Sequence, residues 1–481
     1  MRHQLTLQIL SAALSVQCAF GAAYYVRTDG NNSNAGTTDS AGGAWLTVQK
    51  AATTMVAGDT VTVKNGRFPE YVTVSTADGS SGSPIRFIAE STNAVVGGFD
   101  ISRPYIQIVG FTICGTNVGG FDGLIEVQTN ANHLVIAGNH FDSPYRAHAA
   151  SQYQYLLLMK SSAAADWIYP TNVLINGNFF GTVEQIAVTL FGRGHRFTSN
   201  RMESAFISLA ADGDRDAMRF FSSDTLVEGN VITNWSSVGV GAGHPDVFQA
   251  FTGAGQVATN NRIQNNLVID CAGTQIGNIE DQDGLRNVGW WTWGTNIFSN
   301  VGFVMGVWTH DFYFYNNTFY RCGTNSSAAP FYYGYDVGNG TNGDGGIVLN
   351  NLFVECGPDQ GIGTSFGHYS INNVYTNATA YPSYSSANYD YNLVIGSGAG
   401  TTKTTFAIYG REANGINGSD PLFTNPGADD YSLQAGSPAL GTGLGGVNIG
   451  AWQGAGSGGS SSRSPTLLQG NIRSQGSVIF R

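Results

Sequence analysis

A short pattern that recurs along most of the chain constrains its fold more than any other feature. In each occurrence an alternating apolar segment ends at an Asn, as in HLVIAGN and NVLINGN, and three segments place a Cys five residues after the Asn. The Asn positions are Asn139, Asn178, Asn200, Asn230, Asn266, Asn296, Asn317, Asn351 and Asn373. They are separated by 39, 22, 30, 36, 30, 21, 34 and 22 residues. The repeat therefore has a minimum of 21 or 22 residues, with variable additions.

A repeat of this length matches one coil of three short strands and three turns. Such a unit cannot bury its own apolar face, so neighbouring coils must stack and enclose one continuous interior. The Asn of each coil would occupy a tight turn above the Asn before it. Leucine-rich repeats need a denser Leu pattern, and propeller blades need about 40 residues or more. The pattern predicts an all-β parallel β-helix.

Composition and the first residues of the mature chain agree with a capped, turn-rich β fold. The chain holds 65 glycines and 13 prolines, and 11% of its residues are charged. Gly and Asn tolerate the left-handed conformation that tight turns require. The segment WLTVQKAATTM places Trp45, Val48, Ala52 and Met55 at helical spacing. We expect a short amphipathic helix there that covers the N-terminal end of the stack.

The two ends of the chain are typical of an exported protein with a flexible tail. Residues 1–22 have a basic start, an apolar run and small residues, which is the pattern of a cleaved secretory signal. We expect a β-helix domain at 23–453, a Gly/Ser linker at 454–464 and a tail at 465–481. No later segment has the roughly 18 apolar residues of a membrane span. The protein is expected to be secreted or attached to the cell surface, as a monomer.

The charge of the chain disfavours nucleic acids and anionic lipids as partners. The formal net charge is −11, and removal of Arg2 with the signal makes it −12 because that segment contains no acidic residue. An acidic surface repels polyanions in general, although a few local arginines can still bind an acidic substrate. The four cysteines beyond residue 22 are too few for a disulfide scaffold of this length.

Chemistry-bearing residues gather in three successive coils that share the pattern [D/H]-x-D-x-x-[R/Q]. The segments are DRDAMRFF, GHPDVFQAF and DQDGLRN. They contain, in order, Asp214, Asp216 and Arg219, then His244, Asp246 and Gln249, then Asp281, Asp283 and Arg286. The preceding coil has Glu184 and Thr189 at matching places, with Ile186 breaking the pattern.

Stacking of these coils would gather several carboxylates. Neighbouring strands lie about 4.8 Å apart, so Asp216, Asp246 and Asp283 would form one column. Like charges that close repel in a partly dry site and require a cation, a shared proton or flanking arginines. Because side chains alternate along a strand, Asp216 and Arg219 can share a surface only if the D-x-D segment lies in the turn before the strand. A structural ladder of turn residues is the alternative interpretation.

Candidates of lower weight surround this group. Trp308 and His310 follow it in VWTHDF, and Tyr155 and Lys160 lie in the 39-residue gap. A lone His such as His195 is more often structural than functional. The tryptophans Trp290, Trp291 and Trp293 fit either the core or a platform for sugars.

Several motifs together resemble one superfamily. YYVRTDGNNSNAGT, AGDTVTVKNGRF, the NxxFxxCG coils and LQAGSPALGTG are similar to those of secreted right-handed parallel β-helix proteins of the pectate-lyase-like superfamily. The resemblance covers nearly the whole mature chain. It implies a right-handed helix and a polysaccharide substrate. It does not select a reaction, because the superfamily includes lyases, hydrolases, epimerases and binding proteins.

Within that class we expect a lyase that cleaves an anionic, uronate-type polysaccharide by β-elimination. His244 is the best candidate base, with Asp246, Asp216 and Arg219 as its catalytic neighbours and Lys160 as a weaker substitute base. Carboxylate density favours a calcium ion held by Asp214, Asp281 and Asp283. The substrate would be bound by Arg286, Gln249, Trp308, His310 and Lys160.

Two other functions stay open. In a glycoside hydrolase, Asp246 with Asp216 or Asp283 would act as the carboxylate pair, and their separation would decide the stereochemical outcome. In a carbohydrate-binding or adhesion protein, the same ladder would bind without turnover. The sequence does not identify the sugar.

Overall fold

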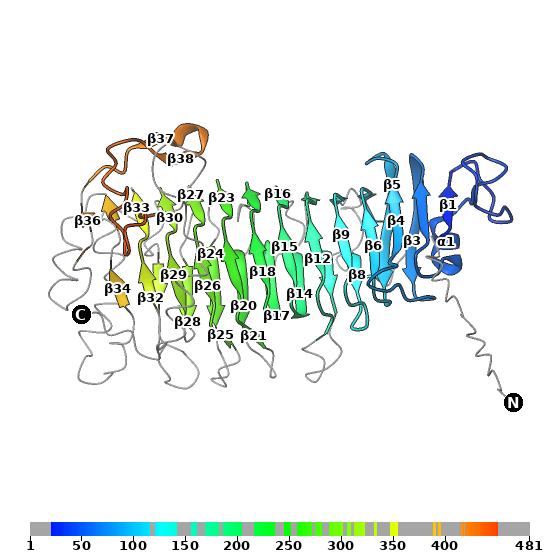
Figure 1. Ribbon diagram of the computed structural model, residues 1–481, viewed down its shortest axis with the longest axis horizontal. Coiled ribbons are helices and arrows are strands. Elements are labelled where there is room, and N and C mark those ends of the chain that lie inside the picture. Colours follow the sequence, from blue (N-terminus) through cyan, green and yellow to red (C-terminus); the bar gives the residue numbers. More distant parts are fainter. Residues whose placement is uncertain are drawn as a thin grey trace, which may run out of the picture.

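The structure, a computed structural model, describes the chain from residue 21 to residue 450 with gaps. The described residues are 21–115, 121–141, 155–160, 169–181, 186–203, 216–235, 245–251, 257–271, 275–280, 288–301, 305–308, 312–322, 331–333, 347–354, 388–390, 393–395, 414, 416–417 and 419–450. Strands follow one another along a single long axis, from β1 at the N-terminal end to β36 near the C-terminal end (Figure 1).

One strand of each coil belongs to a 13-stranded parallel sheet, here called the first stack. Its members are β1 (Ala23–Val26), β2 (Thr60–Val63), β4 (Ile85–Ala89), β6 (Ile106–Val109), β9 (Val135–Ala137), β12 (Leu174–Asn176), β15 (Arg196–Thr198), β18 (Leu226–Glu228), β22 (Arg262–Gln264), β26 (Thr292–Gly294), β29 (Tyr313–Tyr315), β32 (Ile347–Leu349) and β34 (Asn388–Asp390). Each strand pairs with its counterpart in the next coil.

The other strands form a 21-stranded sheet that divides into two further stacks. The second stack contains β7 (Thr112–Ile113), β10 (His140–Phe141), β13 (Phe179–Phe180), β16 (Arg201–Glu203), β19 (Val231–Thr233), β23 (Leu267–Ile269), β27 (Ile297–Ser299), β30 (Thr318–Tyr320), β33 (Leu352–Val354), β35 (Leu393–Ile395) and β36 (Ile416–Asn417). The third stack contains β8 (Gly123–Val127), β11 (Tyr155–Met159), β14 (Ile186–Arg193), β17 (Met218–Ser223), β20 (Asp246–Phe251), β24 (Gln275–Glu280), β28 (Met305–Trp308) and β31 (Phe331–Tyr333).

Two long strands join the second and third stacks at the N-terminal end. β3 (Gly66–Val74) pairs with β5 (Ala94–Ile101), and β5 pairs with β7 through its first half and with β8 through its second half. A minor parallel pair, β21 (Ala258–Thr259) with β25 (Val288–Gly289), lies beside the main stacks. Three parallel stacks whose strands follow one another in turn along the described coils make a right-handed parallel β-helix, which confirms the predicted fold class.

One continuous apolar interior runs through the coils from Val26 to Cys322. Aromatic rings pack edge to face along it, such as Phe87, Phe99 and Phe111 with ring centroids 6.0 and 5.6 Å apart. Trp291 and Trp293 are fully buried in the same interior, so they belong to the core, whereas Trp290 is exposed. Each buried aliphatic or aromatic side chain contributes about 1.5–3 kcal/mol of hydrophobic free energy.

An asparagine ladder fixes the turn between the first and second stacks. Each Asn from Asn178 to Asn351 accepts, at its Oδ1, hydrogen bonds from the backbone N–H or the side-chain Nδ2 of the ladder Asn before it; for Asn139 and Asn178 these distances are 2.9 and 3.1 Å. Nδ2 also donates to a first-stack carbonyl one coil earlier, as from Asn178 to Ile136 at 2.9 Å. The predicted ladder is confirmed from Asn139 to Asn351.

The backbone before each ladder Asn is left-handed, with φ between 53° and 65°. Gly fills this position at Gly138, Gly177 and Gly229, and Asn fills it in three other coils. These two residue types carry the smallest penalty for that conformation. The turn geometry therefore explains the recurring GN and NN pairs of the sequence.

The prediction that Asn373 is the next member of the ladder is wrong. β32 and β33 pair with β34 and β35, and Leu349 lies opposite Asp390. The coil after Asn351 is therefore longer than the expected 22 residues, and Asn373 lies outside the described residues. The sequence pattern gave a wrong position here because YSINN has the same apolar alternation as the strands that precede the ladder asparagines.

The N-terminal end is closed by α1 (Val48–Thr54), as expected from the sequence. Val48, Ala51 and Ala52 are buried against the core, and Trp45 and Met55 flank the helix and are buried as well. Glu70 on β3 accepts the backbone N–H groups of Val48 and Gln49 at 2.7 and 2.9 Å, which anchors the first turn of the helix. Burial raises the pKa of Glu70.

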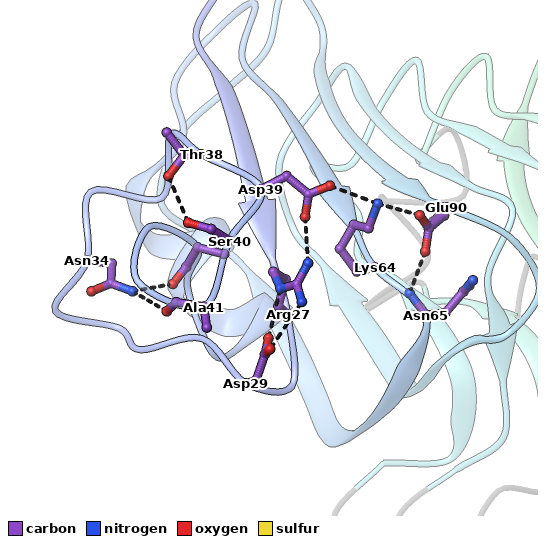
Figure 2. Close-up of polar contacts among 11 residues, drawn as sticks. Arg27, Asp29, Asn34, Thr38, Asp39, Ser40, Ala41, Lys64, Asn65 and Glu90 are labelled. Carbon is purple, nitrogen blue, oxygen red and sulfur yellow. Dashed lines mark hydrogen bonds and ion pairs between the residues drawn. The ribbon is translucent and has the colours of Figure 1, made fainter.

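An exposed ionic cluster joins the N-terminal loop to the first coils (Figure 2). Arg27 lies 2.8 Å from Asp29 and 2.9 Å from Asp39. Lys64 contacts Asp39 at 2.9 Å and also pairs with Glu90. The hydrogen bond from Arg27 lowers the pKa of Asp39, and the one from Lys64 lowers the pKa of Glu90. The loop is thus tied to β2 and β4 by alternating charges.

Residues 419–450, here called the C-terminal cover, pack on the outer face of the second stack. They contain β37 (Phe423–Asn425), the 3₁₀ turn η4 (Pro426–Ala428) and β38 (Asp430–Leu433), and β37 pairs antiparallel with β38. A second apolar cluster joins Phe423 and Tyr431 of the cover to Ile297 and Leu352 of the stack. The Tyr431 hydroxyl donates to Ser299 Oγ at 2.6 Å.

The predicted signal, linker and tail fall outside the described residues, apart from residues 21 and 22. No helix within the described ranges has the length and apolar character of a membrane span. Cys114, Cys271 and Cys322 are buried, and burial raises the pKa of Cys271 to about 12.

Candidate functional site

Four consecutive coils place a polar side chain at the same point on the outer face of the third stack. The strand register aligns Thr189 with Arg219, Arg219 with Gln249, and Gln249 with Asn278. Their neighbours in sequence, such as Val188 and Phe248, point into the core. We call Thr189, Arg219, Gln249 and Asn278 the polar row. At about 4.8 Å per coil, it extends roughly 14 Å along the axis of the solenoid.

Asp216 and Arg219 form a buried ion pair at the centre of this row. Asp216 lies just before β17 and is fully buried. Its Oδ2 accepts from Nε and Nη2 of Arg219 at 2.9 and 2.5 Å, and its Oδ1 accepts the backbone N–H of Asp246 at 3.0 Å. The side chain of Arg219 is 16% exposed. As predicted, the Asp precedes the strand and shares a surface with the Arg, and this arginine supplies a counter-charge.

The next coil repeats the arrangement with an amide in place of the guanidinium. Asp246 begins β20 and is fully buried, and its Oδ2 accepts a hydrogen bond from Gln249 Nε2 at 3.1 Å. The register of β17 and β20 confirms the predicted alignment of Arg219 with Gln249, and it places Asp216 in line with Asp246. The same spacing of three residues thus holds an Asp against its strand partner in both coils.

Three members of the polar row have buried oxygen atoms with unused hydrogen-bonding capacity. Thr189 Oγ1, Gln249 Oε1 and Asn278 Oδ1 have no hydrogen-bond partner among the described residues. Buried polar atoms are nearly always hydrogen-bonded, so an exception needs an explanation such as a ligand. All three atoms can accept, and the Thr hydroxyl can also donate. The row is therefore chemically suited to a ligand rich in hydroxyl groups.

An aromatic row runs beside the polar row, two residues further along each strand. It consists of Phe191, Phe221 and Phe251 on β14, β17 and β20. The ring centroids of Phe191 and Phe221 are 4.8 Å apart, and those of Phe221 and Phe251 are 5.1 Å apart. The Arg219 guanidinium lies 5.4 Å from the centre of the Phe251 ring. Sequence reasoning missed this row, although outward positions filled by Phe in three aligned coils are a readable signal.

Lys160 and Tyr155 lie on the same stack, on β11 or just after it. Lys160 Nζ is 2.7 Å from a carboxylate oxygen of buried Glu126 and 3.9 Å from Asp122. Burial raises the pKa of Tyr155; the positive charge of Arg219 lowers this pKa, and the negative charge of Asp216 raises it. Lys160 therefore forms an ion pair with Glu126, although 32% of its side chain is exposed. Its predicted role as a substitute base stays untested, and an ion pair with a buried carboxylate disfavours it.

The predicted alignment of the third DxDxxR segment is wrong. Asp246 lies opposite Gln275, and Gln249 lies opposite Asn278, so neither Asp283 nor Arg286 is in line with the row. The DxDxxR pattern predicted that the strand follows Asp283, but the strand is QIGNIE, which ends at Glu280. Asp281, Asp283 and Arg286 come after it and lie outside the described residues. The apolar alternation of a strand, and not the position of its charged residues, decides which residues align.

Several other predicted residues also lie outside the description. His244, Asp214 and His310 are among them. Trp308 ends β28, and its backbone lies opposite Glu280, which in turn lies opposite Phe251. The expected calcium site therefore stays a prediction. Within the described ranges, no group of three or more His, Cys, Asp or Glu side chains is arranged to hold a metal ion.

His195 is structural, as a lone buried His more often is. It is fully buried; its Nδ1 accepts the backbone N–H of Val173 at 3.2 Å, and its Nε2 lies 2.7 Å from the carbonyl of Phe191. A backbone N–H can only donate, so Nδ1 is the acceptor and Nε2 carries the proton. Desolvation lowers the pKa of His195 to about 4.

Comparisons with known proteins concern the fold. No protein-family model and no curated protein matches the chain. Among solved structures it is similar to the pectate lyase Pel9A (16% identity, 90% of this chain and 96% of that one, TM-score 0.42). It is also similar to a mannuronic acid specific polysaccharide family 6 lyase from human gut microbiota (16%, 71% and 82%, TM-score 0.45) and to the GH136 lacto-N-biosidase from Eubacterium ramulus (11%, 70% and 68%, TM-score 0.44).

Proposed function

We propose that this protein cleaves an anionic, uronate-containing polysaccharide by β-elimination on the outer face of the third stack. The observation that supports this proposal is the polar row, in which buried oxygens of Thr189, Gln249 and Asn278 lack partners among the described residues and Arg219 supplies a positive charge. Hydroxyl groups of a sugar would donate to these oxygens, and a sugar carboxylate would bind the guanidinium.

The length and direction of the row favour a polymer as ligand. Its four members lie on consecutive coils, so binding groups repeat along the axis of the solenoid. A span of roughly 14 Å exceeds one sugar ring. A chain lying across the coils would meet a hydrogen-bonding group at each step.

Elimination uses the charge of Arg219 directly. A carboxylate bound to the guanidinium withdraws electron density from the adjacent carbon, and its C5 proton becomes more acidic. A base removes that proton, the C4–O bond to the next sugar breaks, and the departing oxygen takes up a proton. The product has a C4=C5 double bond. We assign His244 as the base and Asp216 as the residue that orients Arg219.

A calcium ion held by Asp281 and Asp283, just after β24, remains part of this proposal, whereas Asp214 precedes β17 in the sequence and is no longer proposed as a ligand of the same ion. Calcium prefers several carboxylate oxygens and, when bound, would neutralise a second sugar carboxylate. Activity lost with a chelator and restored by Ca²⁺ would support it. Activity unchanged by a chelator would remove the ion from the mechanism and leave the role of Arg219 intact. Export through residues 1–22 is likewise proposed.

Hydrolysis is the second candidate, because Asp216 and Asp246 occupy adjacent coils. Their strands are about 4.8 Å apart, close to the roughly 5–5.5 Å between the carboxyl groups of retaining glycosidases. Both carboxylates accept hydrogen bonds from their own strand partners, Arg219 and Gln249. A carboxylate held by arginine is poorly suited to donate a proton, which is why elimination is preferred.

One assay separates these functions. Acidic and neutral polysaccharides are incubated with the protein, and both ultraviolet absorbance and reducing ends are measured. Elimination produces both signals, hydrolysis produces reducing ends alone, and a binding protein produces neither while retaining the polymer. We expect Arg219→Ala to lower kcat/KM by about a hundredfold or more, and His244→Ala and Asp246→Asn to be impaired as well.

The matched control is Arg201→Ala. Arg201 also pairs with a carboxylate of its own strand, Glu203 at 2.9 Å, but it is exposed on the second stack. Its loss should leave turnover unchanged. Wild-type turnover in Arg219→Ala, with correct folding, would place the reaction elsewhere on the molecule.

A further inference from the structure

A short column of side chains lies next to the polar row, where each third-stack coil begins. Its members come three residues before the polar-row position of their own coil, and in chain order they are Tyr155, Ile186, Asp216 and Asp246. Tyr155 pairs with Ile186, and the register of the next strands continues this alignment through Asp216 to Asp246. We call these four residues the start column.

The start column shares an outer face with the polar row because two consecutive residues between them point inward. Leu156 and Leu157, which follow Tyr155, are both core residues, and the same holds for the two residues that follow Asp216. The side chain of Tyr155 is itself partly exposed and is not part of the core. It therefore leaves its coil on the same side as Asp216.

The Tyr155 hydroxyl lies within reach of the charges of the candidate site. The charges of Arg219 and Asp216 influence its ionisation, and so does the charge of Asp122 in the coil before. At about 4.8 Å per coil, the backbone of Asp216 is roughly 10 Å further along the axis. Ile186 occupies the coil between them, and a tyrosine side chain is long enough to cover most of this distance.

We infer that Tyr155 is the catalytic residue that donates a proton to the departing sugar oxygen. The inference rests on the proposed function and deepens it, because elimination needs a proton donor besides the base His244. Tyrosine is among the side chains that act as general acids.

Other side chains near Arg219 are poorer donors. Asp216 accepts two hydrogen bonds from the Arg219 guanidinium, so it is charged and has no proton to give. Lys160 is bound to the buried carboxylate of Glu126. The amides of the polar row do not ionise, and an arginine remains protonated.

The proposed step balances in protons and electrons. The base takes the C5 proton, the electron pair of the C5–H bond forms the C4=C5 double bond, and the C4–O bond breaks toward oxygen. The O–H bond of Tyr155 breaks and its proton moves to that oxygen, which leaves a phenolate. The positive charge of Arg219 favours the phenolate, which regains a proton from water before the next turnover.

The surroundings of Tyr155 keep it protonated at neutral pH. Desolvation raises its pKa, Asp122 and Asp216 raise it further, and Arg219 lowers it. The ammonium group of Lys160 lies 3.9 Å from Asp122 and partly offsets that charge. The hydroxyl therefore begins each turnover with its proton.

Two substrates that contain the same uronate but different leaving groups test this assignment. One is the polymer from which the wild-type protein makes an ultraviolet-absorbing product; its departing sugar oxygen is strongly basic and needs a proton. The other is an oligosaccharide of that uronate with a 4-nitrophenyl group on the C4 oxygen of its last ring. Nitrophenolate is weakly basic and departs without a proton. The values of kcat and KM are measured on both substrates.

We expect Tyr155→Phe to lower kcat on the polymer by about a hundredfold, with KM unchanged, and to leave kcat on the nitrophenyl substrate nearly unchanged. Arg219→Ala should be impaired on both substrates, because it acts on removal of the C5 proton. The control is Tyr105→Phe, since Tyr105 is a partly exposed tyrosine whose ring stacks on His133 at 4.6 Å. Its activity should match the wild type on both substrates.

The pH profile of the wild type gives a second readout. On the polymer, kcat should fall as the pH rises through the pKa of Tyr155, which lies above the usual tyrosine value of about 10. The reason is that the phenolate has no proton to donate. On the nitrophenyl substrate kcat should not fall over the same range, which also shows that the protein remains folded there.

Three results would overturn this inference and leave elimination at Arg219 intact. Wild-type turnover of the polymer by Tyr155→Phe is the first. Equal losses on both substrates would make Tyr155 a positioning residue. A loss confined to the polymer in Asp246→Asn, and absent in Tyr155→Phe, would assign the proton to Asp246.

Failure of the proposed function has a different signature. The wild-type protein would then give no ultraviolet-absorbing product from any polysaccharide, which overturns the inference as well. A melting temperature of Tyr155→Phe within a few degrees of the wild type shows that the variant has folded.

Discussion

Asp216 and His195 are both titratable and fully buried, and the chain stabilises them by opposite means. Asp216 is bound by the guanidinium of Arg219 and by a backbone N–H, so its charge has partners. His195 is placed between a backbone donor and a backbone acceptor and is kept neutral. A charged buried group needs a counter-charge, whereas a neutral one needs only hydrogen bonds. This distinction separates the candidate site from the scaffold.

The neutral state of His195 makes stability depend on pH. Burial lowers its pKa to about 4 in the folded chain, below the usual 6.5 of a histidine. Between these values the unfolded chain binds a proton that the folded chain does not, so stability falls as the pH is lowered from about 6.5 to about 4. A separation of this size corresponds to roughly 3 kcal/mol of stability. Below pH 4 this contribution changes no further.

Urea denaturation between pH 4 and pH 7 measures the effect. In His195→Gln the amide can accept from Val173 and donate to the Phe191 carbonyl without titrating. The free energy of unfolding of the variant should therefore decline less than that of the wild type across this range. Parallel declines in the two proteins would contradict the assignment of His195 as a neutral buried side chain.

At the scale of the element, the asparagine ladder determines where each coil turns. A ladder Asn bonds to the coil before it and to the coil after it, so its removal leaves partners unsatisfied on both sides. Asn230 accepts from the backbone N–H of Asn200 and donates to Phe197 O and Asn266 Oδ1, at 2.8, 3.0 and 2.9 Å. All these groups lie in the buried interior of the turn.

We expect Asn230→Ala to lower the free energy of unfolding by about 3 kcal/mol or more, since several buried groups lose their partners at once. Gln264→Ala is the control: Gln264 lies in the next coil, is partly exposed and donates one hydrogen bond to Glu228. Its cost should stay below about 1 kcal/mol. Chemical denaturation measures both variants. Equal costs would mean that the ladder contributes little to stability.

The ladder was predictable from sequence because its signal is local. An apolar strand, a residue in the left-handed conformation and an Asn lie within a few residues of one another, and each favours particular residue types that are visible in the sequence. The alignment of the third stack was predictable only in part. The spacing of 30 residues between Arg219 and Gln249 gave the correct register, whereas Asp283 and Arg286 were assigned to a strand that they follow. Variable loops precede these strands, so a charged motif alone does not fix the register.

The aromatic row was missed for a related reason. Outward and inward phenylalanines look alike in a strand such as MRFFSS, where Phe220 is in the core and Phe221 faces outward. Only the partner strands show which side each ring occupies. The ion pair of Asp216 with Arg219 was accessible from sequence, because it requires only a turn followed by a strand.

At the scale of the whole molecule, the N-terminal end and one side of the solenoid are covered. Helix α1 closes the N-terminal end, and the C-terminal cover packs on the second stack near the other end (Figure 1). Tyr431 is central to this cover: it is buried, its ring centroid lies 5.6 Å from that of Tyr320 and 5.4 Å from that of Phe423, and its hydroxyl bonds Ser299. Burial raises its pKa above the usual value for tyrosine.

We expect Tyr431→Ala to reduce the free energy of unfolding by about 4 kcal/mol, because a large buried ring is replaced by a cavity. Tyr431→Phe, which removes the hydroxyl alone, should cost about 1 kcal/mol. Urea denaturation gives the energies, and limited proteolysis should cleave the alanine variant first within residues 419–450. Resistance of that segment in Tyr431→Ala would show that the cover is held by other contacts.

The ladder spans intervals as short as 21 and as long as 39 residues with the same hydrogen bonds at every step. Much of the extra length falls between second-stack and third-stack strands, as between Phe141 and Tyr155 or between Glu203 and Met218. Insertions and deletions at that border change the surroundings of the polar row while the opposite corner keeps its geometry. A lineage built on this scaffold can thus vary the face that carries this row without redesigning its framework.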